Sequence, residues 1–236
     1  MGYEILKKEW GAERPIRGVL FDMDGLVLDT EKLYARFWRE AAAFYGFNMS
    51  YTQALGMRAA NSRLSEAKLH EAFGPGADYR QLRAKRIELM EAYIDENGVE
   101  SKPGIRELLD YLEDKGIATA ITSSSPVDRI AKHLGSLGLY HRFTQICSGY
   151  DVPWGKPAPD IYLKGAAVLG LKPEECLALE DAPTGITSAF RAGCVTVVIP
   201  DLDEPTGETL SQCHAKADSL MDIIDLLEMR SNCSLQ

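Results

Sequence analysis

Val19-Leu20-Phe21-Asp22-Met23-Asp24-Gly25 is an apolar run that ends in two acidic residues and a glycine. The run predicts a buried strand that would hold Asp22 rigidly at the edge of a sheet, and Gly25 would let the backbone turn sharply away. The same residues also fit a solvated turn, because Asp-Gly is a common turn dipeptide. An EF-hand calcium loop does not fit, because its glycine position falls on Val27 and its closing glutamate position on Leu33. The rest of the chain has to decide between a site and a turn.

The composition of the 236-residue chain indicates a globular protein that is not built for nucleic acid. Its 45% hydrophobic content is enough for a sizeable core. The net charge is -9 and the basic residues are spread through helical stretches, so the basic patch of a nucleic-acid binder is missing from the sequence. An anionic substrate would therefore need local positive charge or a metal.

Cysteine usage and the first residues favour a cytoplasmic protein. The cysteines are odd in number and form no C-x-x-C pair, which suits reduced thiols in the core. They are Cys147, Cys176, Cys194, Cys213 and Cys233. Residues 1–10 lack the apolar region of a signal peptide, and no 18-residue apolar run predicts a membrane span. With no obvious exposed apolar stripe, we expect a monomer.

The sequence pattern changes character twice along the chain. A short apolar strand is predicted over residues 17–21, residues 30–98 have an almost entirely helical pattern, and strands alternate with helices from Pro103 onward. Such alternation predicts a parallel, doubly wound α/β sheet, because parallel neighbours need a crossover. We therefore predict an N-terminal extension over 1–15, a Rossmann-like core over 16–30 and 99–236, and an all-helical insert over 31–98.

Periodicity and breakers give the expected elements. In the insert, Thr30 is the predicted N-cap of a first helix, and further helices are expected over 61–73 and 79–94. Pro103 suits the first turn of the next helix. The core helices are expected over 103–115, 127–137, 159–169 and 184–192, and the strands over 117–122, 143–147, 176–179 and 195–199. Residues 230–236 are expected to be a frayed tail.

Three later strand ends also carry chemically capable residues. Ser123 and Ser124 follow a strand and precede a helix, Lys156 lies between a glycine and a proline, and Glu180-Asp181 follows another strand. Each has a simpler explanation, since Ser, Asp and Glu commonly cap helices. In open parallel sheets, however, ligands bind at the carboxyl ends of the strands. Paired acids, a hydroxyl, a lysine and paired acids at four strand ends together favour a site.

This set of motifs resembles the haloacid dehalogenase superfamily, in its branch of β-phosphoglucomutases and sugar-phosphate phosphatases. The matching residues are Asp22-x-Asp24-Gly25-x-x-x-Asp29-Thr30, Ser123, Gly155-Lys156-Pro157 and Glu180-Asp181, in the family's order and spacing. The resemblance covers residues 16–227. It implies a Rossmann-like core, and it identifies the helical insert as a cap that closes as a lid.

The resemblance also implies the roles of the site residues. Asp22 would be the nucleophile that forms an aspartyl-phosphate, and Asp24 the acid and base for the leaving alcohol and the incoming water. Lys156 would neutralise charge, and Ser123, Ser124 and neighbouring N–H groups would hold the phosphoryl group. Mg²⁺ is the expected cofactor. Its ligands would come from the Asp22 carboxylate, the Asp24 backbone carbonyl, Asp181 and, directly or through water, Glu180.

The insert separates phosphatase from mutase. β-Phosphoglucomutases carry a cap histidine where this chain has Tyr34, and an arginine where it has Ala59 if Gly56 is the cap glycine. The absence of these contacts favours hydrolysis. Candidate substrate residues in the cap are Tyr34 and Lys85 together with Arg58, Asn61 and Arg86, although a solvated helix face would also explain the polar ones.

The motifs and the family that they resemble together imply a Mg²⁺-dependent phosphatase that acts on a small phosphorylated metabolite, with a sugar phosphate as the expected substrate. Phosphomutase activity through the same aspartyl-phosphate is the alternative. A catalytically idle binding module on the same fold is a third reading, which the intact set of four motifs disfavours. True dehalogenases lack the second aspartate, so Asp24 argues for chemistry at phosphorus.

Overall fold

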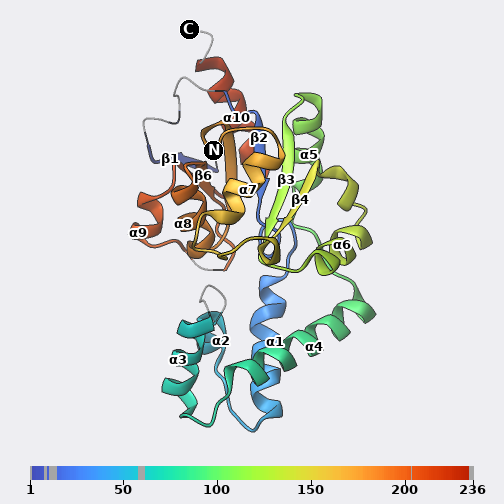
Figure 1. Ribbon diagram of the computed structural model, residues 1–236, viewed down its shortest axis with the longest axis vertical. Helices are drawn as coiled ribbons and strands as arrows, with labels where there is room; N and C mark the ends of the chain where they lie inside the picture. The colour runs from blue at the N-terminus through green and yellow to red at the C-terminus, as the bar shows by residue number, and fades with distance from the viewer. Residues whose placement is uncertain (1, 8–9, 11–14, 58–61, 203, 234–236) are drawn as a thin grey trace. The chain divides into compact units, whose positions relative to one another are not determined.

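The chain divides into two compact units in a computed structural model that describes residues 2–7, 10, 15–57, 62–202 and 204–233. Unit 1 combines residues 1–29 with residues 100–236, and unit 2 spans residues 30–99 (Figure 1). Where the chain leaves and re-enters unit 1, the Asp29 N–H donates to the Glu100 carbonyl at 2.9 Å, and Leu28 forms an antiparallel bridge with Ser101. The two crossings are therefore hydrogen-bonded to each other.

Unit 1 contains a seven-stranded sheet with the order β1-β7-β6-β5-β2-β3-β4. All neighbouring pairs are parallel except β1 with β7. The strands are β1 (Tyr3–Ile5), β2 (Gly18–Phe21), β3 (Ala118–Ser123), β4 (Gln145–Ser148), β5 (Cys176–Glu180), β6 (Val195–Val198) and β7 (Ala215–Ala217). This confirms the predicted parallel α/β fold, and it places β2 centrally between β3 and β5.

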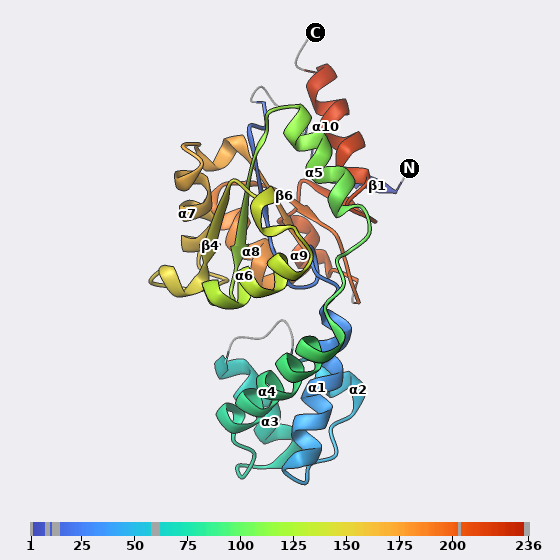
Figure 2. The ribbon, with the colours of Figure 1, turned by 90° about the vertical axis from the view of Figure 1, so that its right-hand side faces the viewer.

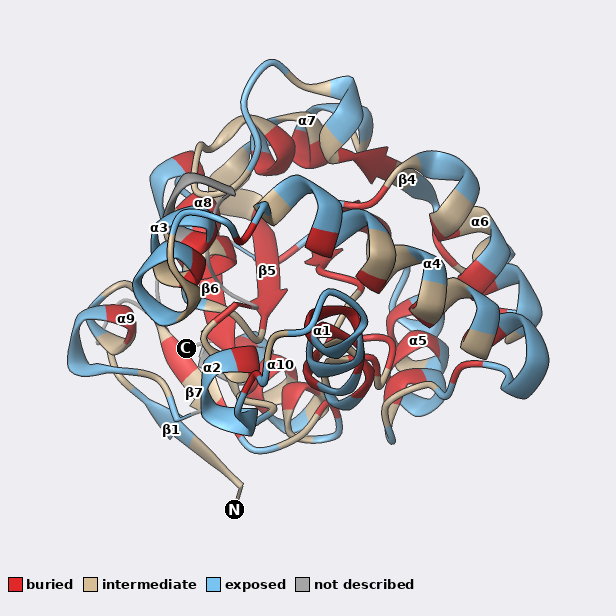
Figure 3. Ribbon diagram, turned by 90° about the horizontal axis from the view of Figure 1, so that it is seen from below, coloured by how far each residue is buried: buried red, intermediate tan, exposed pale blue. Residues whose placement is uncertain are grey.

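Helices cover both faces of the sheet. They are α5 (Ile105–Asp114), α6 (Val127–Ser136), α7 (Asp160–Val168), α8 (Pro183–Ala192), α9 (Gly207–Ser211) and α10 (Asp222–Cys233). Figure 2 shows α5 beside α10, and the two are also in contact, whereas α7 packs against α8. With this strand order, the right-handed crossover that parallel strands favour places α5 and α6 on one face and α7 and α8 on the other. The central strands are thus shielded from water on both sides, as the red colour of β5 and β6 in Figure 3 illustrates.

Burial explains why β2 and β5 read as uninterrupted apolar runs. Every residue of both strands is buried, since a parallel strand between two helical layers has no solvent-facing side. Four of the five cysteines, Cys147, Cys176, Cys194 and Cys213, are buried free thiols, as expected. Burial raises their pKa above the usual range, which keeps them in the inert thiol form. The side chain of Cys233 lies outside the described residues.

The described residues near both ends of the chain form more regular structure than the sequence predicted. The stretch expected as an N-terminal extension contributes β1 to the core sheet. The expectation of a frayed tail over residues 230–236 is wrong for residues 230–233, because α10 runs to Cys233 and Arg230 is buried. Residues 234–236 lie outside the described part of the chain. The Arg230 Nη1 donates to the Trp10 carbonyl at 2.6 Å, and its guanidinium lies 5.5 Å from the centre of the Trp10 ring.

Unit 2 consists of helices α1 (Glu31–Phe44), α2 (Tyr51–Leu55), α3 (Ser62–Phe73) and α4 (Tyr79–Asn97). Its core is an apolar cluster that includes Trp38, Met49, Leu69 and Leu82, with the Trp38 ring stacked on Tyr79 at 5.9 Å. Thr30 occupies the predicted N-cap position of α1 but makes no capping hydrogen bond through its side chain.

Two further details of the helices differ from or add to the predictions. The helix expected from Pro103 begins at Ile105, because Gly104 adopts φ +87° at its N-cap. Among the described residues, none of the helices is both long and apolar enough to span a bilayer.

Candidate active site

Three neighbouring strands bring the sequence motifs to one edge of the sheet. β3, β2 and β5 lie side by side and run parallel, so the residues at their carboxyl ends meet. Asp22 directly follows β2, Ser123 ends β3 and Glu180 ends β5. Gly25 turns the chain away from β2 with φ +90°, and its N–H donates to the Leu28 carbonyl at 2.9 Å. The turn that the Asp-Gly pair predicted is therefore present beside the cluster.

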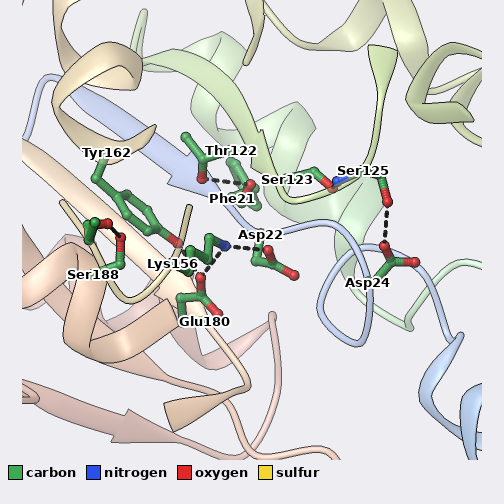
Figure 4. A network of polar contacts seen from close by, with 11 residues as sticks. Phe21, Asp22, Asp24, Thr122, Ser123, Ser125, Lys156, Tyr162, Glu180 and Ser188 are labelled. Carbon is green, nitrogen blue, oxygen red and sulfur yellow. Dashed lines mark hydrogen bonds and ion pairs between the residues drawn. The ribbon is translucent and has the colours of Figure 1, made fainter. Parts of the chain in front are cut away.

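Lys156 lies between two carboxylates in the centre of this cluster. Its Nζ is 2.5 Å from Asp22 Oδ1 and 2.5 Å from Glu180 Oε1 (Figure 4). The side chains of all three residues are almost completely buried, with Glu180 only 1% exposed. Charge-assisted bonds of this kind in a water-poor site fix the ammonium firmly between the acids.

Two residues that the sequence analysis did not select hold Glu180 in place. The buried Tyr162 hydroxyl donates to Glu180 Oε1, next to the Lys156 bond. Burial and the nearby Glu180 carboxylate raise the pKa of Tyr162 well above its ordinary value, so it stays a donor. On the other side, a Cβ at Gly185 would lie 2.0 Å from Glu180 Oε1. Only glycine leaves room for this carboxylate at the start of α8.

The cluster carries more negative charge than one lysine can neutralise. Burial raises the pKa of Asp22 from 3.8 to about 8, although the Lys156 ammonium acts in the opposite direction. Burial by itself would lower the pKa of Lys156, but the carboxylates of Asp22 and Glu180 outweigh it and raise that pKa. Lys156 is therefore protonated, and the acids around it favour a further proton or a second cation.

Asp22, Glu180 and Asp181 form a carboxylate group that could hold such a cation. One oxygen from each lies within 4.8 Å of the others, and all three donors are hard oxygens, as Mg²⁺ prefers. Within the described part of the chain, the Asp24 carboxylate does not belong to this group. The side chains present thus fit a hard divalent cation.

Asp24 and Ser123 are connected through Ser125. The Ser125 hydroxyl donates to Asp24 Oδ2 at 3.2 Å, and the Ser125 N–H donates to Ser123 Oγ at 3.1 Å. Figure 4 shows Asp24 turned towards Ser125, whereas Asp22 turns towards Lys156. The Ser123 hydroxyl accepts from the Ser125 N–H, and a hydroxyl in this arrangement can also donate one hydrogen bond. The neighbouring Ser124 is exposed.

The candidate substrate residues of the cap have different surroundings. Tyr34 lies in the first turn of α1, and the centre of its ring is 4.5 Å from the guanidinium carbon of the buried Arg86. Lys85 instead lies 4.3 Å over the ring of Phe44, in the last turn of α1, and pairs with Glu88 at 2.6 Å. Adjacent in sequence, Lys85 and Arg86 thus contact opposite ends of the same helix.

Two of the predicted cap residues, Arg58 and Asn61, fall in the segment 58–61. Arg58, Ala59 and Asn61 lie outside the described residues. Trp154, just ahead of the Lys156 motif, is 72% exposed and is not a core residue.

The chain is similar in sequence to a known family and to several phosphatases. Residues 16–193 match the family model of haloacid dehalogenase-like hydrolases. Hexitol phosphatase A of Escherichia coli is 32% identical over 185 residues, which are 78% of this chain and 82% of that protein. The phosphorylated carbohydrates phosphatase of Thermotoga maritima is 32% identical over 206 residues, 86% of this chain and 93% of the relative.

A solved structure supports the fold. The β-phosphoglucomutase of Clostridium difficile superposes with a TM-score of 0.74 at 22% identity, over 92% of this chain and 97% of that one. The family model and the relatives therefore show the family to which the resemblance pointed, and the solved structure shows the same fold.

Proposed function

The chain belongs to the haloacid dehalogenase-like hydrolases, and from that membership we propose that it is a Mg²⁺-dependent phosphatase of small phosphorylated metabolites, using Asp22 as nucleophile. The observation that carries this proposal is the buried cluster of Asp22, Lys156 and Glu180 at the carboxyl ends of β2 and β5. The Asp22 carboxylate can attack phosphorus, and the Lys156 ammonium, 2.5 Å away, and the hydroxyl of Ser123 can stabilise the phosphoryl group as it transfers.

Asp22 acts first in the proposed reaction. One of its carboxylate oxygens forms a bond to phosphorus while the bond from phosphorus to the substrate's alcohol oxygen breaks. Asp24 gives a proton to that alcohol as it leaves. In the second half, water attacks the phosphorus, Asp24 takes a proton from the water, and the bond from Asp22 to phosphorus breaks. Phosphate and the free alcohol are the products, and both acids return to their starting states.

Lys156 and the β3 end stabilise the transferring group. The ammonium of Lys156 offsets charge on Asp22 and on a phosphate oxygen, and Glu180 and Tyr162 fix where that ammonium lies. Ser123 and Ser124 donate to the remaining phosphate oxygens. Preorganised donors of this kind cost little reorganisation during the reaction.

Asp22, Glu180 and Asp181 would hold Mg²⁺, with the Asp24 backbone carbonyl as a further ligand. When bound, the ion would supply positive charge that offsets the repulsion between the Asp22 carboxylate and the negatively charged phosphate. Burial raises the pKa of Asp22 to about 8 even with the Lys156 ammonium beside it, so a second cation would help to keep this carboxylate ionised near neutral pH.

The substrate class rests on the relatives. Phosphatases named for hexitols and for phosphorylated carbohydrates match more than three quarters of this chain at 32% identity. A sugar or sugar-alcohol phosphate is therefore the proposed substrate, and Tyr34 in place of the mutase histidine supports hydrolysis over isomerisation.

A phosphatase screen with product analysis tests the proposal. Hexitol, hexose and nucleoside phosphates are compared by kcat/KM with Mg²⁺, and Asp22→Asn is run alongside. We expect free phosphate from the wild type and about 10⁴-fold or greater loss in Asp22→Asn. An isomerised phosphosugar without free phosphate would show a mutase, and turnover by Asp22→Asn would contradict the nucleophile assignment.

A further inference from the structure

Three serines at the ends of β3 and β4 form a hydrogen-bonded unit beside the proposed acid. Ser123 and Ser148 are paired residues at the carboxyl ends of these parallel strands. The Ser125 N–H donates to Ser123 Oγ at 3.1 Å, and the Ser125 carbonyl accepts from Ser148 Oγ at 2.7 Å. Ser148 Oγ also accepts from the Tyr150 N–H at 3.1 Å. The backbone of Ser125 is thus fixed from both sides.

This unit presents one hydroxyl, that of Ser125, to Asp24. Ser125 is buried, and its Oγ donates to Asp24 Oδ2 at 3.2 Å. A buried hydroxyl whose backbone is fixed at both the N–H and the carbonyl holds its donor direction better than a surface serine would. Residues at the ends of β3 and β4 therefore contribute to the orientation of the Asp24 carboxylate, which itself follows β2 in the chain.

The Asp24 carboxylate lies close in sequence to the residues that could bind a cation. Asp22, two residues earlier, belongs to the carboxylate group that could hold a cation, whereas the Asp24 carboxylate does not. A carboxylate bound to a metal cannot carry a proton for an alcohol. In the structure Asp24 accepts from Ser125 and points towards it, away from that group (Figure 4).

We propose that Ser125 is a positioning residue that holds the Asp24 carboxyl in the orientation required for proton transfer to the leaving alcohol. This inference rests on the proposed function, because it assigns a role to Asp24 as the acid. A donor at Oδ2 favours the carboxyl proton at Oδ1, which makes Oδ1 the oxygen that delivers it. As the bond between phosphorus and the alcohol oxygen breaks, that proton moves from Oδ1 to the alcohol oxygen.

The dependence of the rate on the leaving group distinguishes this role from a structural one. A sugar alcohol is a poor leaving group and needs an acid, whereas p-nitrophenolate leaves with little help. General acids supply about 10²- to 10⁴-fold, mostly for poor leaving groups. Misplacing Asp24 therefore slows the first substrate much more than the second, while a distorted site would slow both.

The test compares kcat/KM of the full chain for a hexitol phosphate and for p-nitrophenyl phosphate with Mg²⁺, since kcat/KM reports the step in which the alcohol leaves. Ser125→Ala is expected to lose about 10- to 100-fold on the hexitol phosphate and less than about threefold on p-nitrophenyl phosphate. Ser125→Thr keeps the hydroxyl and is expected to restore most of the rate. Ser136→Ala is the matched control, because its hydroxyl bonds a backbone carbonyl within α6 at 2.8 Å and is expected to change neither rate.

A double-mutant cycle completes the test. In an Asp24→Asn background, Ser125→Ala is expected to cause no further loss, because both changes remove the same acid function. Equal losses on both substrates, or an additional full loss in the Asp24→Asn background, would overturn the inference. Failure of the wild type to hydrolyse either substrate would contradict the proposed function itself, and turnover by the wild type with an unchanged Ser125→Ala would contradict only the role of Ser125.

Discussion

Lys156 in the core and Arg86 in the cap are both buried cations, and they are held in different ways. Lys156 lies at 2.5 Å from each of two carboxylates. Arg86 lies over aromatic rings, with its guanidinium 4.5 Å from the centre of Tyr34 and 5.5 Å from that of Trp38. Two ion pairs of this geometry fix the Lys156 ammonium in one place, whereas the Arg86 guanidinium packs on two ring faces and donates from Nη1 to the soft acceptor Met90 Sδ at 3.8 Å.

The difference matches two different tasks. In the proposed reaction every phosphomonoester brings the same phosphoryl group to Asp22, so a fixed ammonium beside that carboxylate would suit all of them. The organic part of the substrate varies within the family, from hexitols to other carbohydrates in the named relatives. We expect changes at Lys156 and its partners to affect activity strongly and changes in the cap to affect it less.

Asp22→Asn is expected to have the largest effect in the core. The amide cannot attack phosphorus as a carboxylate does, so kcat should fall about 10⁴-fold or more while the fold is kept. Steady-state assays with saturating Mg²⁺ measure this change. If kcat falls less than tenfold in Asp22→Asn, Asp22 is not the nucleophile.

Lys156→Met comes next. It leaves Asp22 and Glu180 buried without their cation, so we expect a loss of about 10³-fold in kcat and, in metal-free protein, a loss of about 3–5 kcal/mol in unfolding free energy. Lys164→Met is the matched control, because Lys164 pairs with Asp151 at 3.1 Å on the more exposed side of α7. Equal effects from the two substitutions would mean that the buried pairing has no special role.

The unfolding free energy of the metal-free protein should depend on pH through the buried carboxyl of Asp22. The pKa of Asp22 is raised from 3.8 to about 8 in the folded protein, so the folded state binds this proton more tightly than the unfolded chain does. The stability gained from protonation is complete below about pH 4 and is lost as the pH rises towards 8.

Wild-type protein in EDTA should therefore lose a few kcal/mol relative to Asp22→Asn over this range, since each pKa unit corresponds to about 1.4 kcal/mol. Urea unfolding at several pH values measures the difference. Adding Mg²⁺ should reduce this difference in unfolding free energy. If the unfolding free energies of the wild type and Asp22→Asn change with pH in the same way without metal, Asp22 is not a buried, destabilised carboxylate.

Gly185→Ala tests the packing around Glu180. The added Cβ would have to displace a carboxylate 2.0 Å away, so Lys156 should shift with it. We expect a fall of about 10- to 100-fold in kcat/KM and about 1–3 kcal/mol in stability. Gly135→Ala in α6 meets no atom within 4 Å and should be neutral or slightly stabilising. A fully active Gly185→Ala would show that Glu180 can move without consequence.

The smallest effects are expected in the cap. Arg86→Met should lower the local stability of α1 and α4 by about 1–2 kcal/mol, because Arg86 is buried against two rings. Lys85→Met should change it by less than about 0.5 kcal/mol, because its partner Glu88 is largely exposed. Amide hydrogen exchange in the two helices distinguishes them. The reverse order would contradict the assignment of Arg86 to the cap core.

The sequence predicted the central sheet because its strands are buried on both faces and read as continuous apolar runs, as at Val19-Leu20-Phe21. It also identified Asp22, Lys156 and Glu180 from residue types at strand ends, and the structure brings these three together. β1 and β7 escaped prediction, since three residues carry too little pattern and their pairing joins the two ends of the chain.

Roles that depend on tertiary contact were also missed. Tyr162 reads as an ordinary helix residue and Gly185 as part of a helix start, until folding places both against Glu180. Similarly, Lys85 and Arg86 look alike in sequence, and only the packing of α4 on α1 sends them to different rings.

The central claim is that Asp22 carries the phosphoryl group. Rapid acid quenching during turnover of a hexitol phosphate with Mg²⁺, followed by tandem mass spectrometry of the peptides, tests it directly. The account predicts one phosphoryl group on Asp22 in the wild type and none in Asp22→Asn. Phosphate release without any phosphorylated peptide, or a phosphoryl group on another residue, would contradict it.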